Sequence, residues 1–139
     1  MNETEVIRSM LGRHPDEPRT IAVIGMTDNP DKPSNYVPAY MRQHGYRIIP
    51  VNPQIESVLG ERAYASLADL PVKPEVVNVF RLPKFLPGII DEMLKLGLKN
   101  IWIQSGIINL EAAKHAESNG INVVMDRCMM VEHRRSGLS

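Results

Sequence analysis

The residues best placed to do chemistry lie where an apolar run, residues 21–25, gives way to a polar loop. Gly25, Met26 and Thr27 open that loop, and it leads through two prolines to Ser34, Asn35 and Tyr36. A helix that begins there would present unpaired N–H groups and the positive end of its dipole, which suits a diphosphate. Ser34 and Asn35 are candidates to cap this helix or to contact phosphate directly. The alternative is a plain strand-to-helix turn with Ser34 as its cap.

Two common nucleotide motifs are missing from the chain. Gly25 is the only glycine where a GxGxxG fingerprint would place three, and the second apolar run ends in Val51-Asn52-Pro53 without an acidic residue for an adenosine ribose. There is also no Gly-Lys-Ser/Thr triplet. The sequence therefore disfavours an ordinary NAD-dependent dehydrogenase and a P-loop enzyme.

The elements that must position these residues follow from hydrophobic periodicity. Short β-branched runs alternate with helix-length amphipathic segments, which is typical of parallel sheets covered on both faces. The pattern predicts an α/β, Rossmann-like three-layer sandwich with a mostly parallel sheet of five strands, or alternatively six. Strands are expected at 21–25, 47–51, 75–80, 100–104 and 122–125, and helices at 3–12, 35–44, 66–70, 84–96 and 110–119. In such a sheet the ligand crevice lies at the carboxyl ends of the strands.

Composition limits the possible classes of protein. The 139 residues carry 16 basic and 16 acidic side chains, so no global field favours nucleic acid or an anionic membrane. A single cysteine and the lack of a signal-like or membrane-spanning stretch predict a cytoplasmic protein. The four histidines show no metal-ligand spacing, so no metal is expected. We expect one domain over residues 1–139, in which 1–19 form an N-terminal helix and lead-in.

Several short motifs follow one another along the chain. They are Val51-Asn52-Pro53, Phe80-Arg81, Ile101-Trp102-Ile103-Gln104-Ser105-Gly106, Met125-Asp126-Arg127-Cys128 and Val131-Glu132-His133. Taken together, they resemble the motifs of the small stand-alone CoA-binding-domain proteins, which are related to the CoA-binding domain of the succinyl-CoA synthetase α subunit. The similarity covers about residues 20–135.

This resemblance implies that coenzyme A, or an acyl-CoA, lies across the carboxyl edge of the sheet. It places the diphosphate beside Gly25, Met26 and Thr27, with Ser34, Asn35 and Tyr36 at the start of the next helix. It places Asn52 and Pro53 at the adenosine end, Phe80 and Arg81 along the nucleotide, and Gln104, Ser105 and Gly106 nearer the pantetheine arm.

One position departs from the family pattern. The residue after Asn52-Pro53 often carries a Lys or Arg that could meet the 3′-phosphate of CoA, whereas this chain has Gln54. Arg47, Arg81 and Lys32 are the candidate substitutes. Gln54 therefore weakens the preference for CoA over other adenine nucleotides.

Three functions remain open from the sequence. The first is a non-catalytic or regulatory CoA-binding module, favoured because no nucleophile–base pair and no further domain is evident. The second is an enzyme or enzyme subunit that handles CoA thioesters or thiols through Cys128, whose neighbour Arg127 could stabilise a thiolate. The third is a protein that binds an unidentified protein partner and keeps only a vestigial nucleotide pocket.

Overall fold

The computed structural model describes residues 1–12 and 18–138. Five strands form the main sheet: β1 (Thr20–Ile24), β2 (Arg47–Val51), β5 (Val76–Val79), β6 (Asn100–Ile103) and β7 (Asn122–Met125). The α-helices are α1 (Thr4–Leu11), α2 (Pro33–Gln43), α3 (Leu86–Leu96), α4 (Leu110–Ser118) and α5 (Met129–Ser136). Smaller elements are the strands β3 (Ser57–Val58) and β4 (Glu61–Arg62) and the 3₁₀ turns η1 (Leu67–Asp69) and η2 (Pro83–Phe85).

The main sheet is parallel and has the order β2-β1-β5-β6-β7. Because β1 lies between β2 and β5, the chain leaves β1 toward one side of the sheet and returns on its other side. This reversal is the topological switch point of a doubly wound sheet, and ligand crevices in such folds open there. The predicted Rossmann-like α/β class and the five parallel strands are confirmed.

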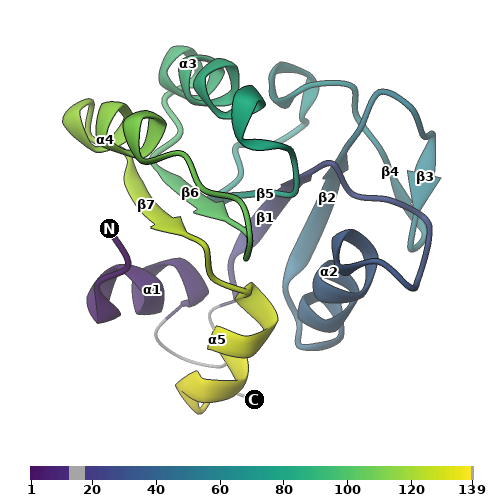
Figure 1. The fold of residues 1–139 in the computed structure, drawn as a ribbon. Coiled ribbons are helices and arrows are strands. Elements are labelled where there is room, and N and C mark those ends of the chain that lie inside the picture. Colours follow the sequence, from purple (N-terminus) through teal and green to yellow (C-terminus); the bar gives the residue numbers. More distant parts are fainter. Residues whose placement is uncertain (13–17, 139) are drawn as a thin grey trace.

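Helices cover both faces of this sheet (Figure 1). Alternate residues of each strand point to opposite faces, so Ala22 and Ile24 join one core while Ile21 and Val23 join the other. The first core lies under α3 and α4, and the second lies under α1, α2 and α5. Trp102 is fully buried in the second core, where its Nε1 donates to the carbonyl of Arg127 at 2.9 Å.

Two features were not anticipated from the sequence. The strands β3 and β4 form a separate antiparallel hairpin beside β2, and they do not add a sixth strand to the main sheet. The helix α5 was missed because its sequence, MMVEHRRS, is mostly polar and shows little amphipathic periodicity. The predicted lead-in, including His14, falls in part on residues 13–17, which lie outside the described residues.

The helix α5 is held against α2 by a group of aromatic rings. His133 is buried, and its Nδ1 lies 2.8 Å from the hydroxyl of Tyr40. Its ring also packs edge-on against His44, at 4.9 Å between centroids, and against Tyr46, at 5.6 Å. Burial, and second the nearby His44, lower the pKa of His133. His44 is half-buried in this cluster.

Candidate functional site

The candidate site begins at the carboxyl ends of β1, β2 and β5, where Gly25 joins all three strands. Its N–H donates to the carbonyl of Val51 at 3.0 Å, while the N–H of Phe80 donates to Ile24 at 2.9 Å. Gly25 has φ +87°, a conformation that L side chains rarely adopt. A Cβ placed on it would lie 2.9 Å from the carbonyl oxygen of Phe80 and 3.1 Å from the Arg81 Cδ. Glycine is therefore required here by packing, before any ligand is considered.

The turn after Gly25 is fixed by two asparagine side chains. The Nδ2 of Asn52 donates to the carbonyl of Met26, and the Nδ2 of Asn35 donates to the carbonyl of Thr27, both at 2.8 Å. With its carbonyls held in this way, the turn leaves the N–H of Met26 without a hydrogen-bond partner among the described residues. Met26 is fully buried, so its N–H is closed to solvent, and the groups open to a ligand beside this turn are those of Thr27 and of the first turn of α2.

The helix α2 begins two residues earlier than the sequence suggested. Pro33 is its first residue, a position where the missing N–H of proline costs nothing, and Lys32 is the N-cap. Ser34 is therefore not the cap, and its hydroxyl makes no hydrogen bond within the described part of the chain. Tyr36 is 42% exposed in the same first turn. Ser34 and Tyr36 are thus available at the positive end of the helix.

The ends of β5 and β6 supply the next group of predicted residues. The Arg81 guanidinium lies 4.1 Å from the centroid of the Phe85 ring, and Phe80 and Arg81 are both half-buried. Ser105 and Gly106 are exposed, whereas Gln104 is 3% exposed and its Oε1 lies 3.4 Å from the backbone N–H of Met129. The Gln104 side chain therefore supports the start of α5 and does not point to solvent.

Asp126 is a supporting residue whose partner the sequence did not reveal. It follows β7 with φ +61°, and its Oδ1 accepts from the N–H of Gly106 at 2.7 Å. This carboxylate therefore holds the loop after β6. Arg127 does reach the C-terminal helix, with its Nη1 3.4 Å from Glu132 Oε1. Only the adjacency of β6 and β7 brings Asp126 to Gly106.

The predicted site residues thus gather at one edge of the sheet, but in two roles. The side chains of Met26, Asn35 and Gln104 are buried and shape the edge from within. The exposed or half-buried members include Thr27, Pro53, Arg81 and Ser105 in the loops, and Ser34 and Tyr36 in the first turn of α2. Cys128 is half-buried at the same edge, directly before α5. Its reactivity stays a prediction.

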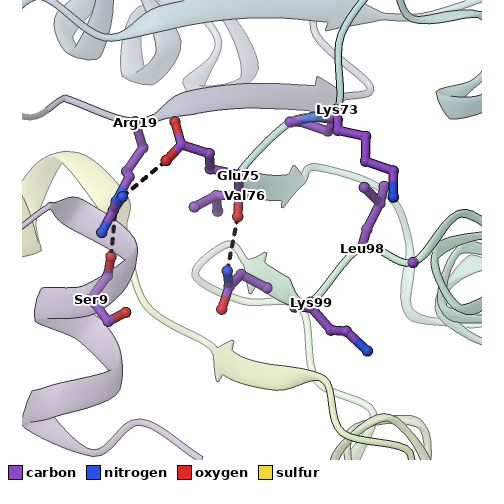
Figure 2. A pocket seen from close by; sticks show the side chains of 10 residues that line it. Ser9, Arg19, Lys73, Glu75, Val76, Leu98 and Lys99 are labelled. Carbon is purple, nitrogen blue, oxygen red and sulfur yellow. Dashed lines mark hydrogen bonds and ion pairs between the residues drawn. The ribbon is translucent and has the colours of Figure 1, made fainter.

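A hollow that the sequence did not predict lies at the opposite, amino edge of the sheet. It measures about 260 Å³, and Figure 2 shows Arg19 between Ser9 and Glu75 on its wall. The Arg19 guanidinium bonds the Ser9 carbonyl at 3.2 Å and the Glu75 carboxylate at 2.9 Å. Lys73 lies beside Gly97, at the negative end of the α3 dipole. Arg19 and Lys73 thus already have structural roles in this hollow.

Metal binding and membrane insertion find no support in the described part of the chain. No group of three or more His, Cys, Asp or Glu side chains is placed there to hold a metal ion. None of the described helices has the length and apolar character needed to cross a bilayer.

The fold and the edge geometry define a doubly wound, Rossmann-like α/β domain with its switch point between β1 and β5. The family model described as CoA binding domain matches residues 19–134, and the chain belongs to this family. The uncharacterized protein YneT of Bacillus subtilis is 41% identical over 83% of this chain and 85% of its own length.

Two solved structures are also similar over nearly the whole chain. The Thermus thermophilus protein called cell-free ID.343 superposes with a TM-score of 0.84 at 44% identity, covering 98% of this chain and 99% of that one. A hypothetical protein from Pyrococcus horikoshii OT3 gives 0.85 at 39% identity, covering 97% and 98%.

A longer relative is an enzyme. Acetate–CoA ligase [ADP-forming] II of Archaeoglobus fulgidus is 29% identical over 72% of this chain, but the matched region is only 15% of the ligase. The similarity therefore concerns one part of that enzyme, and its ligase activity does not transfer with it.

Proposed function

We propose that this protein binds coenzyme A, or an acyl-CoA, at the carboxyl edge of its sheet, as a non-catalytic or regulatory module. The observation that carries the proposal is the turn at Gly25–Thr27, whose carbonyls are held by Asn35 and Asn52 at the switch point, beside the exposed first turn of α2. Backbone donors at a helix N-terminus bind phosphate oxygens. Membership in the CoA binding domain family supports CoA as the source of that phosphate.

The remaining predicted residues extend this site in both directions. The turn at Asn52 and Pro53 would take the adenosine end, since it lies at the end of the neighbouring strand β2. Phe80 and Arg81 would border the nucleotide from β5, and the exposed loop at Ser105 and Gly106 would lie along the pantetheine arm. No assembled set of catalytic side chains is part of this proposal.

Titration calorimetry of the purified protein with CoA, acetyl-CoA, NAD and ATP tests the proposal directly. CoA or acetyl-CoA should bind more tightly than NAD and ATP. No heat and no thermal shift with any of the four would overturn the proposal and favour a vestigial pocket. A mass spectrum under native conditions would identify a ligand that remains bound through purification.

The variant Ser34→Glu locates the site. A carboxylate in the first turn of α2 is favourable for the helix, so the fold should be retained, but it repels a diphosphate. We expect CoA affinity to fall at least about tenfold, since each 1.4 kcal/mol is a factor of ten. Thr4→Glu is the matched control, because Thr4 begins α1, which packs beside β7 at the far side of the sheet. Equal loss in both variants would contradict the assignment.

Cys128→Ala separates binding from thiol chemistry. If the protein is a binding module, the variant should bind CoA as tightly as the parent, because Cys128 follows β7 while the predicted diphosphate position follows β1. A loss of binding, or a covalent CoA adduct on Cys128 detected by mass spectrometry, would instead favour the thiol-handling function.

A further inference from the structure

A hollow of about 420 Å³ lies beside the Asn52-Pro53 turn, on the outer side of β2. It exists because the chain after β2 folds back on itself. The segment after β4 then pairs with the end of β2, through Asn52 N–H to the Tyr64 carbonyl at 2.8 Å and Tyr64 N–H to the Pro50 carbonyl at 3.0 Å. Figure 1 shows the β3–β4 hairpin beside β2. The hairpin therefore adds side chains to the adenosine end of the predicted site.

Arg62, the last residue of β4, is the cation that lines this hollow. Neighbouring residues of a strand point to opposite sides, and Glu61 turns toward α2, where it lies 3.6 Å from Arg42. The Arg62 guanidinium stacks over the Tyr64 ring at 5.2 Å from its centroid. It has no carboxylate partner among the described residues. Within residues 1–12 and 18–138, its charge is thus not neutralised by an ion pair.

The three cations suggested by the sequence are less well placed to replace a basic residue at Gln54. Arg47 begins β2, five residues before Asn52, and a strand rises by about 3.3 Å per residue, so it lies roughly 16 Å away at the amino edge. Arg81 packs over Phe85 beside the Gly25 turn. Lys32 precedes α2, next to the predicted diphosphate position. The hairpin alone brings a cation to the turn that contains Gln54.

We infer that Arg62 recognises the 3′-phosphate of CoA and so replaces the basic residue that is absent at Gln54. This inference rests on the proposed function, because it assumes that the adenosine end lies at Asn52 and Pro53. A guanidinium forms two parallel hydrogen bonds to phosphate oxygens and keeps its charge at all physiological pH values. Glu56 is the one carboxylate that lines the same hollow, and it opposes this binding. Arg62 thereby selects CoA over adenine nucleotides that lack the phosphate.

The test compares CoA with 3′-dephospho-CoA on the full chain by titration calorimetry. The parent protein should prefer CoA by about tenfold to a hundredfold, the range for one charge-assisted contact. Arg62→Gln should lose this preference by weakening CoA alone, while Arg47→Gln, the matched control on β2, should keep it. Glu56→Gln should strengthen CoA binding severalfold and leave dephospho-CoA unchanged. Adding Gln54→Lys to Arg62→Gln should restore the preference.

The outcomes separate this inference from the proposed function. If neither compound binds the parent, the proposed function fails. If both bind the parent equally, or if Arg62→Gln keeps the full preference for CoA, CoA binding stands and the role of Arg62 is overturned. Circular dichroism spectra that match the parent would show that each variant is folded.

Discussion

Replacing Gly25 by alanine should destabilise the fold itself, whether or not a ligand is present. Two costs act together at this position. At φ +87° an L residue pays about 1–2 kcal/mol for the left-handed backbone. The added methyl group would also lie 2.9 Å from the Phe80 carbonyl oxygen, which is backbone and cannot move aside easily. Such overpacking costs about 1–3 kcal/mol. The sum is about 2–5 kcal/mol, against a total stability of about 5–15 kcal/mol for a typical protein.

Gly106→Ala is the matched control for this prediction. Gly106 has nearly the same φ, +85°, at the same edge of the sheet, but an added Cβ would meet no atom within 4 Å. Both variants restrict the unfolded chain equally, so that contribution cancels in the comparison. The difference between the two free energies of unfolding therefore isolates the contact with Phe80, and it should be about 1–3 kcal/mol.

Urea unfolding followed by circular dichroism measures both variants, and an unchanged slope would show that the comparison is valid. Equal destabilisation by Gly25→Ala and Gly106→Ala would refute the argument from packing.

The result also decides how binding experiments are designed. A variant of Gly25 that loses CoA binding would not identify a site, because it disturbs the fold first, whereas Ser34→Glu adds charge without a steric conflict at the backbone.

Three further predictions concern the supporting structure. Burial lowers the pKa of His133, so the folded protein binds fewer protons than the unfolded chain, and the free energy of unfolding should fall as pH drops below about 6.5. Between about pH 7 and 5, the urea midpoint of His133→Gln should therefore shift less than that of the parent. An equal shift in both proteins would contradict this. Tyr46→Phe should lower the free energy of unfolding in urea by about 1–2 kcal/mol, because the Leu11 carbonyl loses the hydroxyl that donates to it. An unchanged free energy of unfolding would show that this hydrogen bond does not contribute to stability. Asn109→Ala should lower the free energy of unfolding by about 1 kcal/mol and lower the Tm, since Asn109 Oδ1 caps α4 by accepting from Ala112 N–H at 3.0 Å. An unchanged Tm would contradict a stabilising role for this cap.

Local sequence determined most of the secondary structure in this protein. The five apolar runs became the five parallel strands within one residue at either end, because β-branched runs buried on both faces have few other stable arrangements. The predicted helix start at residue 110 and helix end at residue 96 are confirmed, because Asn109 caps α4 and Gly97 ends α3, and capping depends only on neighbouring backbone groups. The position of the candidate site at the carboxyl edge followed from parallel topology alone.

Contacts between segments distant in the sequence decided the rest. Gly25 is required because the end of β5 packs against it, and Asn35 and Asn52 hold the following turn from two different elements. Arg62 lies beside Asn52 only because a hairpin folds back along β2. Each of these depends on which strands are neighbours, and residue type and spacing along one chain carry no information about such distances. The sequence by itself therefore determined the class of fold and the edge at which the binding site is proposed, whereas the tertiary structure decided which side chains support that edge and which remain exposed at it.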